Sequence, residues 1–241
     1  MAASCIVFGG SGAVGRAVCR RLHAEGAKVG FTYFEGEAVA RELSSELTGV
    51  VARRADLSQP GAAARAAGEL AGALGSVTAF VHCAALGSTV APGGFESLAE
   101  LDEAGWDRLM AVNVRAAAFA ARALCPLMTG GGNVVLIGSV DVDKPVPAPI
   151  GYAASKGALV GLAHSLAKEV GRQAVCVNVL APGMLDAGMS RSVPAKLRAE
   201  YVKHCSLGRL GTIEELVNVI AFFALRNRYV TAQTVLVDGG L

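Results

Sequence analysis

The sequence predicts an α/β fold in which helices cover both faces of a doubly wound parallel sheet. Three observations lead to this prediction. Short apolar runs alternate with longer stretches of helical periodicity along the 241 residues. A glycine-rich segment follows the first apolar run. Hydrophobic residues make up 53% of the chain and charged residues 17%, which suits strands that are buried on both faces. No linker or repeat is evident, so we expect a single domain over residues 1–241.

Seven apolar runs are interpreted as strands because each is short and is bounded by turn residues or by a helical pattern. In chain order, the predicted strands are Cys5–Phe8, Lys28–Tyr33, Val50–Ala55, Ala79–Cys83, Asn133–Gly138, Val175–Leu180 and Thr234–Val237. Parallel strands expose their carboxyl ends at one edge of the sheet, where doubly wound folds bind their ligands. Residues that directly follow these strands are therefore the candidates for function.

Six longer stretches repeat their apolar residues with helical spacing. The predicted helices are Ala13–Glu25, Glu37–Leu47, Ala62–Leu74, Trp106–Leu127, Tyr152–Gly171 and Ile213–Leu225. Two segments show no clear pattern, Gly87–Glu96 and Met184–His204, and both follow strands on the ligand-binding edge. Within the second, Pro194–Tyr201 is predicted to form a short helix with proline at its start, as part of a lid over the substrate.

Composition argues against several classes of function. The net charge is +2 and aromatic residues are 5%, so neither a nucleic-acid nor a membrane partner is expected. No apolar run is long enough to cross a bilayer. The six cysteines show neither C-x-x-C spacing nor a cluster with histidine, so we expect free thiols and no metal site. Unpaired cysteines, with no signal peptide ahead of the first strand, indicate a cytoplasmic protein.

The segment from Gly9 to Gly15 joins the first strand to the first helix. Its glycines permit a tight turn and let backbone N–H groups approach a pyrophosphate, which the helix N-terminus also favours. This arrangement predicts a dinucleotide-binding fold of the Rossmann type. The residue at the end of the second strand, where an acid would bind the ribose of NAD, is Tyr33. Its identity favours NADP(H) over NAD(H), although no arginine follows and Glu35 and Glu37 would repel a 2′-phosphate.

Tyr152 and Lys156 lie four residues apart and therefore on one face of a helix. An ammonium near a phenol favours the phenolate, so we expect Lys156 to lower the pKa of Tyr152 and to prepare it for proton exchange with a substrate oxygen. Ser139 follows a buried strand, where its hydroxyl can bond a reacting carbonyl. Asn113 lies inside a predicted helix, an unfavourable place for asparagine unless it has a polar task.

Together these residues resemble the short-chain dehydrogenase/reductase family over nearly the full length of the chain. The resemblance rests on the glycine loop, on the order and spacing of Asn113, Ser139, Tyr152 and Lys156, on Asp56 with Leu57, and on two further segments, 177–183 and 237–240. The residues from Leu207 to Gly211 and from Ala163 to Glu169 are most similar to those of 3-oxoacyl-carrier-protein reductases.

The resemblance implies an enzyme that reduces a ketone, in a 3-oxoacyl thioester or a related secondary metabolite, to a secondary alcohol. Tyr152 would donate the proton, Ser139 would polarise the carbonyl, Lys156 would hold the ribose and tune Tyr152, and Asn113 would anchor a proton-relaying water. The cofactor contacts implied are Gly9, Ser11, Gly12, Val14, Gly15, Tyr33, Asp56, Leu57, Ala84, Asn113, Tyr152, Lys156, Pro182, Gly183 and Leu185.

Some residues depart from the family pattern. Ala13 replaces a motif glycine, His82-Cys83-Ala84-Ala85 replaces the usual Asn-Asn-Ala-Gly, and Ala187 replaces a threonine that helps hold the cofactor. Basic residues that would dock an acyl carrier protein are not clearly kept. Asp141 and Asp143 could bind a polar substrate group, but solvated loop charge is the favoured interpretation. No catalytic role is expected of His82, His164 or His204.

Two alternatives stay open: an NAD-dependent dehydrogenase that oxidises a small polar alcohol, and a non-catalytic protein that binds the cofactor and regulates a partner. All four residues of the family's catalytic tetrad, which are Asn113, Ser139, Tyr152 and Lys156, are present. Their presence argues against the non-catalytic alternative. The helices around Trp106–Leu127 and Tyr152–Gly171 carry many small apolar residues, and related enzymes pack these helices between subunits. We therefore expect a homotetramer.

Overall fold

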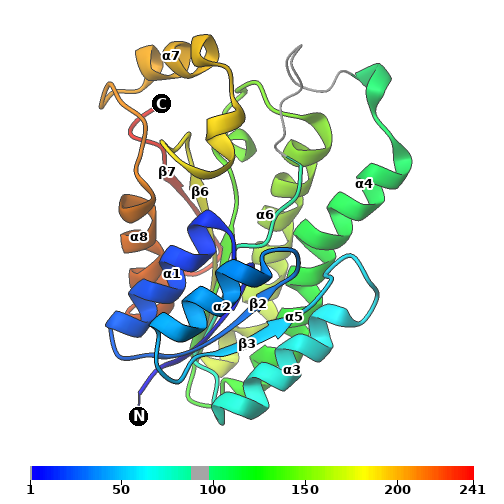
Figure 1. The fold of residues 1–241 in the computed structure, drawn as a ribbon, viewed down its shortest axis with the longest axis vertical. Helices are drawn as coiled ribbons and strands as arrows, with labels where there is room; N and C mark the ends of the chain where they lie inside the picture. The colour runs from blue at the N-terminus through cyan, green and yellow to red at the C-terminus, as the bar shows by residue number, and fades with distance from the viewer. Residues whose placement is uncertain (1, 88–97) are drawn as a thin grey trace.

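The computed structural model describes residues 2–87 and 98–241, and these residues form the predicted doubly wound α/β fold (Figure 1). A seven-stranded sheet has the order β3-β2-β1-β4-β5-β6-β7, and every pair of neighbouring strands is parallel. The strands are β1 Ser4–Phe8, β2 Lys28–Tyr33, β3 Val51–Arg54, β4 Ala79–His82, β5 Gly132–Ile137, β6 Val175–Pro182 and β7 Gln233–Val237. All seven predicted strands are confirmed, with ends that differ by two residues or fewer.

The described residues form eight α-helices, most of which lie in two layers. They are α1 Ala13–Ala24, α2 Glu37–Glu46, α3 Ala62–Leu74, α4 Glu103–Met110, α5 Ala116–Leu124, α6 Ile150–Val170, α7 Ala195–His204 and α8 Ile213–Leu225. One face of the sheet packs against α3, α5 and α6, and the other packs against α1, α2 and α8. Strand β1 shows why both faces are apolar: Ile6 and Phe8 enter the first core, while Cys5 and Val7 enter the second.

The predicted helix Trp106–Leu127 is longer and less regular than expected. It begins with α4 at Glu103, passes through a π-helical turn, Ala111–Arg115, and continues through α5 to a final 3₁₀ turn, Cys125–Leu127. By length and composition this combined helix could cross a membrane, so the prediction that no segment reaches that length is wrong. Half of its most apolar window is buried inside the fold, and such burial is common for a core helix.

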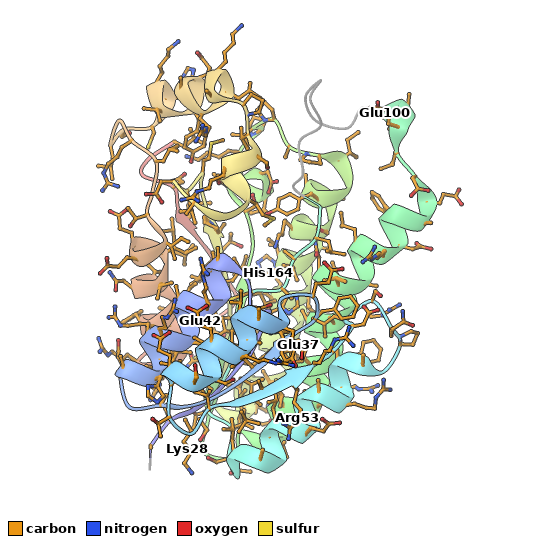
Figure 2. All side chains as sticks on the ribbon, viewed as in Figure 1. Lys28, Glu37, Glu42, Arg53, Glu100 and His164 are labelled. Carbon is orange, nitrogen blue, oxygen red and sulfur yellow. The ribbon has the colours of Figure 1, made fainter. Side chains whose placement is uncertain are left out.

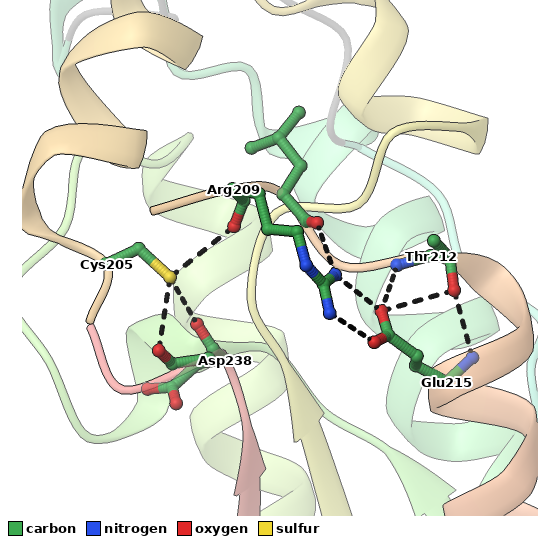
Figure 3. Close-up of polar contacts among 7 residues, drawn as sticks. Cys205, Arg209, Thr212, Glu215 and Asp238 are labelled. Carbon is green, nitrogen blue, oxygen red and sulfur yellow. Dashed lines mark hydrogen bonds and ion pairs between the residues drawn. The ribbon is translucent and has the colours of Figure 1, made fainter. Parts of the chain in front are cut away.

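The connection from α7 to α8 is held by polar contacts (Figure 3). Arg209 donates to the carboxylate of Glu215 at 2.6 and 2.9 Å, and Glu215 closes a capping box with Thr212 at the start of α8. The Cys205 thiol contacts the carbonyl oxygens of Arg209, Asp238 and Gly239 at 3.2–3.5 Å. These bonds fix the C-terminal end of α7 against the chain that follows β7.

Charged side chains lie almost entirely on the outside. Lys28, Glu37 and Glu42 are exposed and reach outward from the region of β2 and α2 (Figure 2). Among the described residues, Lys156 is the only Lys, Arg, Asp or Glu that is fully buried, at 2% exposure. Because burying an unpaired charge is costly, this lysine marks the interior of a functional site.

Candidate active site

Two cavities adjoin each other at the carboxyl edge of the sheet. The first, which we call the catalytic cavity, has a volume of about 560 Å³ and is lined by Ser139, Tyr152 and Lys156 among others. The second, the nucleotide groove, has a volume of about 660 Å³ and extends from the glycine loop to the end of β3. Both are lined in part by Val14, Cys83, Ala85, Gly188 and Met189. A ligand in the groove can therefore reach into the catalytic cavity.

Most of the predicted cofactor residues line one of these two cavities. The groove is lined by Gly9, Ser11, Gly12, Val14, Gly15, Tyr33, Asp56, Leu57 and Ala84. The catalytic cavity is lined by Pro182, Gly183 and Leu185, together with Tyr152 and Lys156. Asn113 lines neither cavity, and its predicted contact with the cofactor stays a prediction.

The glycine loop is held by a buried threonine that the sequence analysis missed. The backbone N–H of Gly10 donates to the Thr32 carbonyl at 2.8 Å, and that of Gly9 donates to the Thr32 hydroxyl at 3.1 Å. Thr32 is 1% exposed and lies at the end of β2 beside Tyr33. A polar residue within an otherwise apolar buried strand was the signal available in the sequence, because such a residue requires a hydrogen-bond partner.

The loop packs too tightly for side chains at several of its glycines, Gly9 and Gly15 among them. A Cβ at Gly15 would lie 2.1 Å from the Gly9 carbonyl oxygen, and Gly9 itself has φ +83°, with Ala84 backbone 2.7 Å from where its Cβ would be. The turn therefore closes directly before α1, where backbone N–H groups and the helix dipole favour a phosphate. This geometry fits the pyrophosphate of a dinucleotide.

The far end of the groove is where an adenosine would lie. The Asp56 carboxylate accepts hydrogen bonds from the backbone N–H and the hydroxyl of Ser58, which lower the pKa of Asp56. Beside Tyr33, the guanidinium of Arg54 lies 5.2 Å from the centre of the Phe34 ring and donates to the Phe34 carbonyl at 3.2 Å. Arg54 does not line the groove, but it places a positive charge beside Phe34, which does. The sequence analysis did not find this charge, because Arg54 belongs to β3 and not to the segment after β2.

Three of the tetrad residues converge in the catalytic cavity. Ser139 follows β5, while Tyr152 and Lys156 come from the first turns of α6. The Lys156 ammonium donates to the Ile137 carbonyl at 2.7 Å and lies 5.3 Å from the centre of the Tyr152 ring. The Ser139 hydroxyl is close enough to act on Tyr152 and lowers its pKa. The arrangement can place a hydroxyl, a phenol and an ammonium around one substrate oxygen.

The expected effect of Lys156 on Tyr152 does not appear. Burial, with a smaller contribution from the charge of Asp141, raises the pKa of Tyr152 well above its ordinary value, and the Ser139 hydroxyl only partly opposes this. Burial also lowers the pKa of Lys156 to about 8. The expectation is wrong for this structure because burial is the largest influence on the pKa of Tyr152, and because the ammonium is directed to a backbone carbonyl.

Asn113 serves the interior of the protein. It lies in the π-helical turn and is 0% exposed. Its side-chain oxygen accepts from the N–H of Leu86 at 2.8 Å, while its amide nitrogen donates to the Leu86 carbonyl at 3.1 Å and to the Ser155 hydroxyl at 2.9 Å. Ser155 in turn donates to the Tyr152 carbonyl at 2.7 Å. These bonds let Asn113 position the segment after β4 against α6. Its predicted role as the anchor of a water stays a prediction.

His82 and Cys83 stand at the end of β4, below the two cavities. Burial lowers the pKa of His82 to about 3, and the charge of Lys156 contributes to this shift. Burial likewise raises the pKa of the Cys83 thiol to about 12. His82 is therefore neutral and Cys83 protonated at physiological pH. Both are uncharged supports for the floor of the site.

The segment from Met184 to His204 covers the catalytic cavity. It contains a 3₁₀ helix, Gly188–Ser192, and α7, which begins after Pro194 as predicted. Leu197 and Tyr201 both line the cavity, as the predicted shared apolar face requires. The segment's position in the fold thus agrees with that of a lid. The other predicted loop lies, apart from Gly87, outside the described residues.

Comparison with known proteins identifies the family. The profile of a family described as enoyl-(acyl carrier protein) reductase matches residues 10–241. The 3-oxoacyl-[acyl-carrier-protein] reductase of Rattus norvegicus is 30% identical over 242 residues, which are 98% of this chain and 97% of that protein. Dehydrogenase/reductase SDR family member 4 of Bos taurus is 37% identical over 153 residues, which cover 61% of this chain and only 54% of the relative.

A solved structure agrees with the sequence relatives. The crystal structure of a blue fluorescent protein from a metagenomic library, in complex with NADPH, has a TM-score of 0.88 and 32% identity. The alignment covers 99% of this chain and 97% of the other. Fold, cavities and relatives thus agree along nearly the whole sequence: the chain belongs to the short-chain dehydrogenase/reductase family and is an NAD(P)-dependent oxidoreductase.

Proposed function

We propose that this protein reduces the ketone of a 3-oxoacyl thioester or a related carbonyl compound to a secondary alcohol, with NADPH as the reductant. The observation that carries the proposal is the convergence of Ser139, Tyr152 and Lys156 in one cavity that is continuous with the nucleotide groove. When bound, NADPH supplies the hydride that adds to the carbonyl carbon. The test is substrate-dependent loss of NADPH absorbance with a panel of 3-oxoacyl thioesters and free ketones.

The chain's own residues then have distinct tasks. The Tyr152 phenol donates its proton to the carbonyl oxygen, and the Ser139 hydroxyl donates a hydrogen bond to the same oxygen. Lys156 keeps donor capacity beyond its bond to Ile137, with which it can bind the ribose hydroxyls of the cofactor. The apolar wall formed by residues 145–149 and the lid keeps water from the reacting atoms.

The raised pKa of Tyr152 agrees with its proposed task as the proton donor in reduction. A proton donor must be protonated at working pH, whereas a base that accepts the proton of an alcohol must be ionised. Because the pKa of Tyr152 is raised, the phenol carries its proton throughout the neutral range. The thioester class is supported by the names of the matching family and of the Rattus norvegicus relative, both of which refer to acyl carrier protein.

NADPH is preferred in this proposal because of the charges near Tyr33. Arg54 lies beside Phe34, whereas Glu35 lines the groove with the opposite charge. If Arg54 binds the 2′-phosphate, Arg54→Ala weakens NADPH binding by roughly 10-fold and leaves NADH binding within about twofold. Glu35→Gln, which removes a repelling charge at the same end, tightens NADPH binding. Fluorescence titration of both cofactors measures these constants, and an equal loss for both with Arg54→Ala would contradict the assignment.

The lid is expected to close over substrate. Hydrogen exchange should be fast in residues 184–204 of the free protein and at least about tenfold slower with NADP⁺ and a product alcohol bound, because closure protects the backbone amides. The sheet strand β1, which is fully buried, provides the internal reference. Exchange as slow as that of β1 in the free protein, unchanged by ligands, would make the segment a fixed wall.

A homotetramer is the expected assembly, with a dimer as the fallback. Helix α6 exposes Ala154, Gly157 and Gly161, and no neighbouring atom lies within 4 Å of a Cβ built at either glycine. On α5, Phe119 is 40% exposed beneath the guanidinium of Arg122, 4.5 Å from the ring centre. Such small and aromatic surfaces favour close packing between subunits. Light scattering should give four times 24.5 kDa, and a monomer mass at micromolar concentration would rule this assembly out.

A further inference from the structure

Asp141 is a charged residue of the catalytic cavity that the proposed chemistry does not use. It lies in a short 3₁₀ turn, Val140–Val142, directly after Ser139. The cavity is otherwise largely apolar, with a proline-rich wall at residues 145–149 on one side and the lid on the other. Solvated loop charge was the favoured interpretation of Asp141 and Asp143. It is correct for Asp143, which is exposed and does not line the cavity, and wrong for Asp141.

Both carboxylate oxygens of Asp141 are shielded from solvent and lack partners. Less than 1 Å² of each oxygen is exposed, and neither has a hydrogen bond of normal geometry with any described residue. Buried acceptors in folded proteins nearly always have a partner, because an unpaired one costs its full hydration. A carboxylate kept in this state beside the reacting residues therefore indicates a partner that arrives with a ligand.

The neighbouring charges do not provide that partner. Lys144, three residues away, is bound to the Asp238 carboxylate at 3.2 Å and to the Leu241 carbonyl. Lys156 donates to Ile137, and its charge only partly offsets the effect of burial, which raises the pKa of Asp141. Ser139 also opposes that rise, but Ser139 is needed for the substrate carbonyl in the proposed reaction.

We propose that Asp141 determines substrate specificity by accepting a hydrogen bond from a hydroxyl or amino group of the substrate, placed on a carbon next to the ketone or one further away. This inference rests on the proposed function, in which Ser139 and Tyr152 hold the carbonyl oxygen of the substrate. Ser139 lies two residues before Asp141 in the chain. The preferred substrate has an apolar body, which the proline wall and the lid enclose, and a donor group beside its carbonyl.

The test compares two ketones of nearly equal size, 2-hydroxycyclohexanone and 2-methylcyclohexanone. The native protein should prefer the hydroxy ketone by roughly 10- to 100-fold in kcat/KM, the range for a hydrogen bond to a charged group. Asp141→Leu removes the acceptor and should bring the ratio to within about threefold. Asp143→Leu, the matched change at the exposed neighbour, should leave the ratio as it is in the native protein.

Melting temperature separates recognition from a structural role. Because Asp141 has no hydrogen bond of normal geometry among the described residues, Asp141→Leu should melt at the native temperature or about 2–4 °C above it. A variant that melts well below the native protein would show that Asp141 holds the fold, and a native protein without preference between the two ketones would overturn the inference.

Calorimetric binding of the same two ketones to the NADP⁺ complex gives an answer that does not depend on turnover. Preferred binding of the hydroxy ketone, abolished by Asp141→Leu, supports the role of Asp141 even if neither ketone is reduced. In that case only the proposed reductase activity is overturned. Reduction of both ketones at equal rates, with equal affinities, retains the reductase and overturns the role of Asp141.

Discussion

Replacing Tyr152 with phenylalanine should lower kcat for ketone reduction by roughly 10²- to 10⁴-fold, the range typical of a positioned general acid. The hydroxyl is the group that carries the proton, while the ring packs beside Lys156 with its centre 5.3 Å from the ammonium. Phenylalanine keeps the ring, so the fold and the affinity for NADPH should change little. Steady-state kinetics together with a cofactor titration measure both effects.

Ser155→Ala is the matched control for this change. Ser155 lies on the same helix and donates to the Tyr152 carbonyl, but it lines neither cavity. The Ser155→Ala variant should lose far less activity than Tyr152→Phe. If Tyr152→Phe keeps activity within tenfold of the native protein, the proton comes from another group, and the assignment of the tetrad is wrong.

Substituting alanine for Gly15 should weaken NADPH binding by roughly 100-fold, or about 3 kcal/mol, and lower the melting temperature. The added Cβ would lie 2.1 Å from the Gly9 carbonyl oxygen and 2.8 Å from its carbon, so the glycine loop must open. Opening moves the backbone N–H groups away from the pyrophosphate. Isothermal titration with NADPH and thermal unfolding measure the two losses.

Gly68→Ala provides the comparison, because Gly68 lies on the exposed side of α3 and no atom lies within 4 Å of the position that a Cβ would take there. Alanine is the better helix former, so this variant should bind NADPH normally and melt at or above the native temperature. Normal cofactor affinity in Gly15→Ala would show that the loop does not hold the pyrophosphate.

The strands and the major helices were predictable from the sequence because buried parallel strands are continuous apolar runs. Thus Val134–Ile137 could be placed without reference to the rest of the chain, and Ser139 after it could be assigned to the ligand edge. Local sequence patterns also identified the glycine loop and the pair Tyr152 and Lys156. These features depend on local pattern and on the rule that ligands bind at the carboxyl ends of strands.

The remaining features depend on contacts between segments that are distant in the chain. The π-helical turn at Asn113 comes with bonds to Leu86 and Ser155, which helical periodicity does not reveal. Arg54 lies beside Phe34, which lines the groove, because β3 pairs with β2 in a register that sets Tyr33 opposite Arg54. The burial of Asp141 depends on how the turn after β5 packs against α6 and β6. In each case the sequence shows the residue but not its neighbours.

The central claim, hydride transfer from NADPH to a ketone, is tested most directly with cofactor that carries deuterium on the pro-S side of the nicotinamide C4. The family resemblance implies that this hydrogen is transferred. Mass spectrometry of the product should find one deuterium on the alcohol carbon and one alcohol for each NADPH consumed. Tyr152→Phe should form the deuterated alcohol only at its residual rate. Product without deuterium, or saturation of a carbon–carbon double bond in an enoyl thioester while 3-oxoacyl thioesters and ketones are left unreduced, would contradict the proposed function.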